Sequence, residues 1–165
     1  RRRHTRYWRD WSSDVCSSDL DYGVGNIKAF VNIYKKLNIP VQVAQNAEEL
    51  AGTKKLILPG VGAFDHAMIK LTNSGMLETV NRMVKLEKVP VLGICVGMQM
   101  LASRSDEGEL NGLGWIEGEV KKFDVNKIKF ETHLPHMGWN DVKAINNNAL
   151  LNKLGKDERF YFLHS

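Results

Sequence analysis

The stretch Pro-Val-Leu-Gly-Ile-Cys-Val-Gly-Met-Gln, residues 90–99, decides how this chain folds. Its apolar first half predicts a short buried strand, and Met98 begins a predicted helix. Cys95 therefore stands at a strand-to-helix junction. Gly93 and Gly97 lie two residues before it and two residues after it. This spacing is typical of a nucleophile elbow, in which larger side chains at the two glycine positions would collide as the backbone reverses.

The junction predicts a reactive thiol at Cys95. A cysteine at a helix N-terminus lies at the positive end of the helix dipole, which favours the thiolate, and the thiolate is the nucleophilic form. The backbone N–H of the next residue, Val96, is directed to where an oxyanion would form. Most free cysteines, however, are small buried apolar side chains. The junction alone leaves both interpretations open.

Length and composition indicate one globular domain. The chain has 165 residues, of which 43% are hydrophobic and 25% charged. No run of residues approaches the roughly 18 apolar residues of a membrane span. The two cysteines and five histidines have no metal-ligand spacing. We therefore expect a cytoplasmic protein with no membrane segment, no metal and no cofactor.

The charge is unevenly distributed along the chain. The formal net charge is +4, and residues 1–20, with five Arg and three Asp, supply half of that excess. The remaining residues are nearly neutral, so the composition does not favour a nucleic-acid partner.

Residues 1–20 differ in character from the rest of the chain. They have neither helical nor strand periodicity, and they lack the apolar region of a secretory signal. We expect them to be a foreign, disordered leader in which Cys16 has no function. The domain is then predicted to cover residues 21–165 and to lack its first strand.

From Asp21 onward, apolar runs of strand length alternate with helical patterns, which predicts a mostly parallel sheet with helices on both faces. Asn26 is a candidate cap for the first helix. The predicted elements are a helix over 27–37, strands over 41–43 and 56–58, helices over 65–71 and 76–86, and the strand over 89–94 that precedes Cys95.

The second half of the chain has a different pattern. Four glycines between residues 106 and 118 predict a loop. An antiparallel region comes next, with strands over 120–123, 127–130 and 142–144, and one more buried strand over 160–163. The chain stops soon after that last strand, so we expect a fragment.

A glycine-rich stretch, Pro59-Gly-Val-Gly62, directly follows a predicted strand. Ligands bind at the carboxyl ends of the strands in open α/β folds, so its amides are candidates to contact a developing negative charge. The alternative is a plain turn. A dinucleotide fingerprint is excluded, because Asp65 occupies the position of the third glycine.

A cysteine nucleophile usually needs a histidine base. His66 begins a predicted helix, His133 and His136 flank Pro135 in a predicted loop, and His164 follows a strand. The sequence does not choose among the last three candidates.

Four motifs, in their order along the chain, resemble those of the glutaminase subunit of imidazole glycerol phosphate synthase, a class I glutamine amidotransferase. They are Asp21-Tyr-Gly-Val-Gly-Asn26, Pro59-Gly-Val-Gly62, Gly93-Ile-Cys-Val-Gly-Met-Gln99 and Pro135-His-Met-Gly-Trp-Asn140. The resemblance covers residues 21–165. It implies a flavodoxin-like α/β domain that hydrolyses glutamine and passes the ammonia to a (β/α)₈-barrel cyclase subunit in histidine biosynthesis.

The resemblance also implies roles for individual residues. Cys95 would form a thioester with glutamine, and the amides of Val61 and Val96 would form the oxyanion hole. The residues expected to hold glutamine are Gly60, Gly62, Gln99 and Ser165. Those expected at the partner interface are Met137, Trp139 and Asn140.

Two departures from the family pattern change what we expect of this chain. The leader stands where the family has an apolar first strand, and a His-Pro-Glu-type segment with the catalytic base does not occur in the sequence. We therefore expect this chain to be inactive. The alternatives are a non-catalytic amidotransferase-like interaction module, and a cysteine or α/β-hydrolase-type enzyme that acts on other acyl groups.

Overall fold

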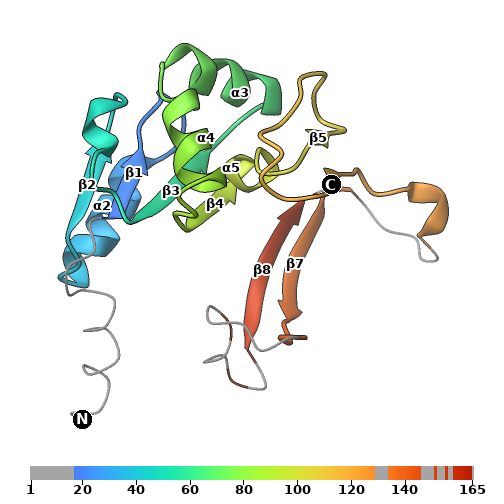
Figure 1. Cartoon of the computed structure of the whole chain (residues 1–165). Helices are drawn as coiled ribbons and strands as arrows, with labels where there is room; N and C mark the ends of the chain where they lie inside the picture. Colours follow the sequence, from blue (N-terminus) through green and yellow to red (C-terminus); the bar gives the residue numbers. More distant parts are fainter. Residues whose placement is uncertain (1–16, 129–133, 146–150, 152–154, 156–157, 165) are drawn as a thin grey trace, which may run out of the picture. The chain divides into compact units, whose positions relative to one another are not determined.

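A computed structural model gives the fold of the chain (Figure 1). It describes residues 17–128, 134–145, 151, 155 and 158–164. The chain divides into two units between Lys121 and Lys122.

The first unit is built on a parallel four-stranded sheet in the order β2-β1-β3-β4. The strands are β1 (Ser17–Leu20), β2 (Val41–Ala44), β3 (Lys55–Gly60) and β4 (Val91–Cys95). This is the strand order of flavodoxin-like folds, so the predicted parallel α/β architecture is confirmed. Gly60 at the end of β3 is in register with Cys95 at the end of β4.

The helices of the first unit match the predicted pattern closely. They are α2 (Ile27–Lys36), η1 (Glu48–Leu50), α3 (Phe64–Asn73), α4 (Leu77–Lys85) and α5 (Val96–Gln99). The side chain of Asn26 accepts a hydrogen bond from the Ala29 N–H, so the predicted cap of α2 is confirmed. Helix α5 begins two residues before Met98, because Cys95 itself occupies the N-cap position.

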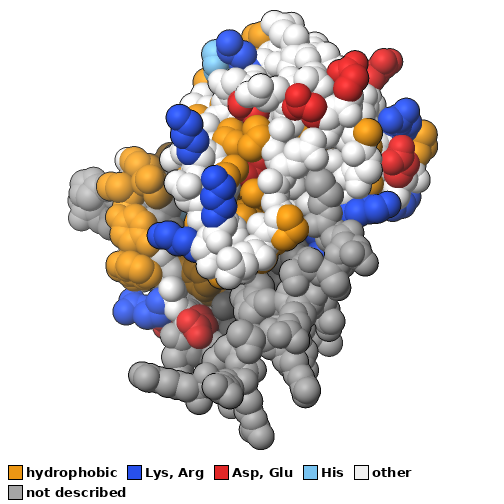
Figure 2. All heavy atoms as spheres, turned by 90° about the vertical axis from the view of Figure 1, so that its left-hand side faces the viewer, with side chains coloured by type: hydrophobic (Ala, Val, Ile, Leu, Met, Phe, Trp, Pro, Cys, Tyr) orange, Lys and Arg blue, Asp and Glu red, His pale blue; other side chains and the backbone are white. Residues whose placement is uncertain are grey.

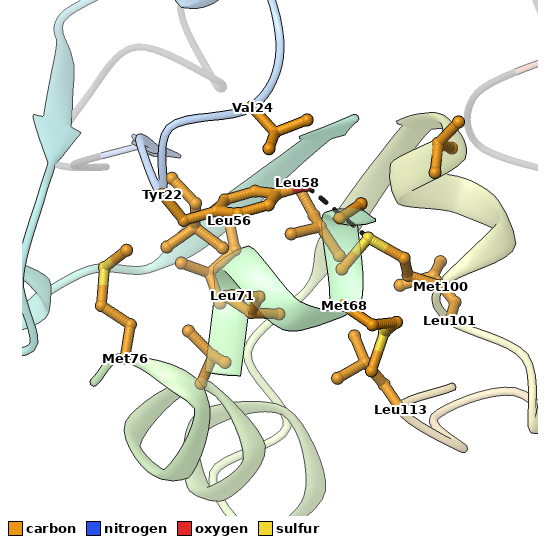
Figure 3. Close-up of a cluster of buried hydrophobic side chains, with 14 of the residues drawn as sticks. Tyr22, Val24, Leu56, Leu58, Met68, Leu71, Met76, Met100, Leu101 and Leu113 are labelled. Carbon is orange, nitrogen blue, oxygen red and sulfur yellow. Dashed lines mark hydrogen bonds between the residues drawn. The ribbon is translucent and has the colours of Figure 1, made fainter. Parts of the chain in front are cut away.

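The apolar core of this unit lies between the sheet and α3, α4 and α5 (Figure 3). Leu56 and Leu58 of β3 contribute to it from the sheet, and the helices contribute apolar side chains at helical spacing. The fully buried members of the core include Leu20, Leu56, Leu58, Phe64, Leu71, Met76, Val80 and Met100.

The central strand β1 corrects the expectation for residues 1–20. Ser17, Ser18 and Asp19 are buried, and β1 pairs with β2 on one side and β3 on the other. The backbone of any residue type can form hydrogen bonds with two neighbouring strands, which explains how a polar segment forms the central strand. The prediction of disorder is therefore wrong for residues 17–20. Residues 1–16, including Cys16, lie outside the described part of the chain.

Two polar side chains of β1 have different surroundings. The Ser18 hydroxyl lies 2.7 Å from that of Thr53. Neither carboxylate oxygen of Asp19 has a hydrogen-bond partner among the described residues. Burial raises the pKa of Asp19 to about 6, because a low-dielectric site disfavours the charged form.

The segment after α5 is held by short strands and ion pairs. Strand β5 (Arg104–Ser105) pairs in parallel with β6 (Glu119–Val120). The Glu119 carboxylate lies 2.7 Å from both the Arg104 guanidinium and the Lys121 ammonium, which lowers its pKa to about 2. The predicted strand over 120–123 is therefore replaced by a shorter element.

The second unit contains η2 (Val125–Lys127) and an antiparallel hairpin of β7 (His136–Asp141) and β8 (Arg159–His164). The predicted strand over 127–130 does not include Lys127, which belongs to η2, and its residues 129 and 130 lie outside the described part of the chain. Two further predictions are wrong in this unit. The stretch around His136 forms β7 where a loop was expected, and the strand expected over 142–144 does not form. The predicted strand over 160–163 is confirmed, but it is largely exposed and antiparallel, so it is not a buried strand of the main sheet.

The surface carries charges of both signs. Figure 2 views the molecule from the side of β2 and α2, where Lys and Arg side chains are separated by uncharged and acidic residues. In the described residues, no helix is long and apolar enough to cross a membrane.

Candidate functional site

Cys95 has a backbone conformation that non-glycine residues rarely adopt. Its φ is 56° and its ψ is −123°, and its side chain is exposed at the edge where β4 ends. Such a conformation costs on the order of 1–3 kcal/mol and persists where the surrounding structure enforces it, often at a functional site. Helix α5 has only four residues, so its dipole contributes little to the reactivity expected of the thiol.

The two glycines around Cys95 are sterically required, which confirms the elbow spacing. A Cβ at Gly93 would lie 2.6 Å from the Met98 Cα, and a Cβ at Gly97 would lie 2.0 Å from the Leu58 carbonyl oxygen. Helix α5 therefore lies directly against β3 and β4. Any side chain at these positions would separate the helix from the sheet.

The stretch Pro59-Gly-Val-Gly62 lies beside this elbow. A Cβ at Gly60 would be 2.3 Å from the Gly97 backbone nitrogen, a close approach that the sequence did not reveal. Val61 is exposed just beyond the end of β3, and Gly62 has a φ of +84°. The structure thus brings both predicted oxyanion-hole residues, Val61 and Val96, to the same edge of the sheet as Cys95.

Gln99, in the short helix that follows Cys95, has an unsatisfied polar atom. It is the last residue of α5, and its Oε1 is buried with no hydrogen-bond partner among the described residues. A buried carbonyl oxygen without a donor is uncommon in native structures and is often satisfied by a ligand or water. This observation fits the predicted role of Gln99 in holding a substrate.

Asp65 supports the site in a way that sequence reasoning missed. Its carboxylate accepts hydrogen bonds of 3.0 Å from the backbone N–H groups of Glu109 and Leu110. The first turn of α3 is thereby tied to the segment after α5. An acidic residue in the first turn of a helix is common, so its position in the sequence did not indicate this second role.

Comparison with known proteins decides the family. The pattern of the family described as glutamine amidotransferase class-I matches residues 19–165. The chain belongs to the class-I glutamine amidotransferase family. The match begins two residues before the predicted domain start and includes Asp19 and Leu20 of β1.

Several class-I amidotransferases named imidazole glycerol phosphate synthase subunit HisH are similar to this chain. The protein from Bdellovibrio bacteriovorus is 60% identical over 146 residues, which cover 88% of this chain and 72% of the relative. Those from Leptospira interrogans and Methanococcus maripaludis are 51% and 43% identical, with coverage of 88% of this chain and 72% and 71% of the relatives. A crystal structure of a glutamine amidotransferase has the same fold, with a TM-score of 0.64 at 22% identity, over 90% of this chain and 69% of that chain.

The described histidines of this amidotransferase lie on different elements, α3 and the hairpin. His66 is exposed on α3. His136 and His164 are cross-strand partners in the hairpin, with ring centroids 5.3 Å apart, and the His136 Nε2 lies 2.8 Å from the Asn140 Nδ2. His133, the remaining base candidate, and Ser165, a predicted glutamine ligand, lie outside the described residues.

One face of the hairpin is apolar and exposed. Met137 and Trp139 of β7 pair with Leu163 and Tyr161 of β8, and these side chains are 55–64% exposed. Trp139 and Tyr161 pack edge to face, with ring centroids 5.7 Å apart. Asn140 lies on the opposite face, so the structure separates it from the other two predicted interface residues.

No group of three or more metal-ligating side chains occurs among the residues that the structure describes.

Proposed function

We propose that this chain is the glutaminase subunit of an imidazole glycerol phosphate synthase, as its relatives' names indicate. The Cys95 sulfur attacks the carboxamide carbon of glutamine and an S–C bond forms. The C–N bond then breaks, and the nitrogen takes up the proton lost by the thiol and leaves as ammonia. Water would then hydrolyse the thioester to glutamate and restore the thiol, a turnover that we do not expect of this chain itself, because its sequence has no His-Pro-Glu-type segment to supply the base. The observation that carries this proposal is the strained, exposed Cys95 at the end of β4, directly beside the glycine-rich end of β3.

The oxyanion of the tetrahedral intermediate would be stabilised by two backbone donors. The Val96 N–H follows the nucleophile, as in other elbows. The Val61 N–H belongs to the Gly60–Val61 peptide, and the wide range of ψ open to a glycine, together with the exposure of Val61, would allow that peptide to rotate toward the oxyanion. Such donors lower the barrier by about 3–4 kcal/mol each in other enzymes.

Substrate binding would involve the unsatisfied amide of Gln99. Its Oε1 is buried in this structure, so the side chain would have to turn toward glutamine to accept a hydrogen bond from a substrate N–H group. That bond would remove the cost of leaving the oxygen unpaired, on the order of 1–3 kcal/mol. The backbone of Gly60 and Gly62, and Ser165, are proposed to complete the pocket.

Selective alkylation of Cys95 tests this function without requiring a complete catalytic cycle. In the probe, a chloromethyl ketone replaces the carboxamide of glutamine. The Cys95 sulfur displaces chloride, and the thiol proton leaves with it as HCl. We expect labelling of Cys95 at least about 100-fold faster than that of Cys16, because the site binds the glutamine portion and stabilises the adduct.

Free L-glutamine should protect Cys95 from the probe, and D-glutamine should not. Peptide mapping by mass spectrometry identifies the labelled cysteine. Equal labelling of the two cysteines, or equal protection by the two enantiomers, would contradict a glutamine site and favour a non-catalytic interaction module.

We further propose that the apolar hairpin face binds the cyclase subunit that uses the ammonia. Aromatic side chains and methionine are enriched at protein interfaces, and an exposed Trp139 packed on Tyr161 is typical of an interface anchor.

Trp139→Ala should weaken binding to the cyclase subunit of the Bdellovibrio bacteriovorus enzyme by about 30-fold or more, the usual cost of removing an anchor. The matched control is Ile145→Ala, which truncates a 96% exposed apolar side chain of the same unit outside the hairpin face. Titration calorimetry measures both affinities. Equal affinities for the two variants would exclude this face as the interface.

A further inference from the structure

Tyr22 connects three segments that meet beneath the candidate site. It lies two residues after β1, is only 5% exposed, and directs its ring toward Met100 (Figure 3). Its hydroxyl donates a hydrogen bond to the Pro59 carbonyl oxygen and lies 3.6 Å from the Met100 Sδ. Pro59 immediately precedes Gly60, and Met100 is the C-cap residue of α5.

The Pro59 carbonyl lies past the last residue of β3 that pairs with β1. Strand β1 pairs with β3 only as far as Ile57. The Tyr22 hydroxyl thus provides a donor for β3 where the neighbouring strand has already ended. Gly25, in the same turn, also lies against Pro59, since a Cβ there would be 2.8 Å from the Pro59 Cβ.

The backbone becomes less restricted only beyond Gly60, which is itself buried at the end of β3 against Gly97. Val61 is exposed, and a Cβ at Gly62 would meet no heavy atom within 4 Å. The carbonyl that Tyr22 contacts therefore lies one residue before the Gly60–Val61 peptide, at which the closely packed end of β3 gives way to exposed backbone.

We propose that Tyr22 is a positioning residue, which fixes the Pro59 carbonyl so that peptide rotation is confined to Gly60–Gly62 and the Val61 N–H is presented to the oxyanion beside Cys95. This inference rests on the proposed glutaminase function. The contacts of the Tyr22 hydroxyl are with Pro59 and Met100 and not with the thiol.

The surroundings of Tyr22 keep its hydroxyl a donor. Burial raises the pKa of this phenol well above its usual range, because the phenolate would be desolvated. The phenol is therefore protonated at neutral pH and can donate to the Pro59 carbonyl. A buried hydrogen bond of this kind also restrains the distance between β3 and α5 through the Met100 contact.

Tyr22→Phe tests the proposal because it removes only the hydroxyl. The readout is alkylation by the glutamine chloromethyl ketone, separated into its saturation constant and its maximal rate constant. We expect the maximal rate to fall about 10- to 100-fold, as for a misplaced oxyanion donor, with the saturation constant changed less than about threefold. Alkylation of Cys95 by iodoacetamide, which needs no oxyanion hole, should be unchanged.

Tyr34→Phe is the matched control. Tyr34 is a partly buried tyrosine of α2, and it is distant in sequence from the residues of the elbow. Removal of its hydroxyl should leave both alkylation rates unchanged. A Tyr22→Phe chain that reacts with the ketone like the parent chain would overturn the proposal. So would a loss of iodoacetamide reactivity or of the cooperative melt, because the hydroxyl would then support the fold as a whole. If the parent chain itself shows no selective labelling of Cys95, the proposed function fails instead.

Discussion

Replacing Asp19 by valine is expected to raise the free energy of unfolding by about 3 kcal/mol at pH 7. The Asp19 carboxylate is fully buried in the central strand, and neither of its oxygens has a partner among the described residues. Its pKa rises from 3.8 to about 6, and a shift of about two pH units corresponds to about 3 kcal/mol. Valine adds apolar burial at the same position.

The gain should depend on pH in a defined direction. The raised pKa means that the folded state binds a proton more tightly than the unfolded state. Asp19 therefore opposes folding least below about pH 4, and its cost grows as the pH rises through about 6. Urea unfolding of the parent and Asp19→Val chains between pH 4 and 7.5 measures this difference.

Two further variants make the Asp19 experiment decisive. Asp19→Asn removes the charge without changing the shape, so it should abolish the pH dependence with a smaller gain in stability, since a buried amide remains. Glu117→Gln removes an exposed carboxylate and should change nothing. If Asp19→Val destabilised the chain at pH 7, the carboxylate would have to be satisfied by a group outside the described residues.

Gly97→Ala is expected to lower the free energy of unfolding by about 4 kcal/mol or more. The added Cβ would lie 2.0 Å from the Leu58 carbonyl oxygen and 2.8 Å from its carbon. Leu58 is a fully buried residue of β3, so neither partner can move without separating α5 from the sheet. Losses of this size are exceptional and arise from severe overpacking of the interior.

Gly62→Ala is the matched control for this substitution. A Cβ at Gly62 meets no heavy atom within 4 Å, and only its positive φ is unfavourable, which costs roughly 1 kcal/mol. Denaturant unfolding of both variants compares the stability lost through a steric clash, at Gly97, with the stability lost through an unfavourable φ, at Gly62. Similar losses for Gly97→Ala and Gly62→Ala would mean that the elbow tolerates a shift of α5 away from β3.

The sequence predicts the fold well where a local pattern and the tertiary structure agree. The apolar runs before Pro59 and before Cys95 become β3 and β4, and the helical spacing after Asn26 becomes α2. The elbow glycines could also be predicted, because their spacing around Cys95 is itself a steric signature.

The central strand could not be predicted from its residues. Ser17, Ser18 and Asp19 have low strand propensity and polar side chains, and only the presence of β2 and β3 on either side makes them a strand. In the hairpin, the alternation of β7 around Gly138 was obscured by Pro135, which is a loop signal in a sequence.

Part of the site was equally inaccessible to sequence reasoning. The Tyr22 hydroxyl and the Asp65 carboxylate act on backbone groups of residues 37 and about 44 positions away. Backbone donors and acceptors are the same in nearly every residue, so the sequence does not indicate which of them a side chain will contact. Such contacts are identified only in the folded structure.

The polar character of β1 also has a consequence for the order of folding. Strands β3 and β4 and helices α3 and α4 are consecutive in the chain and supply nearly half of the apolar core, so they can assemble through comparatively local contacts. Strand β1 gains its backbone partners only when β2 and β3 are both in place, and it contributes one large apolar side chain, Leu20. We therefore expect the junction that carries Cys95 to form early, and the strand at the middle of the sheet to join late and to open first.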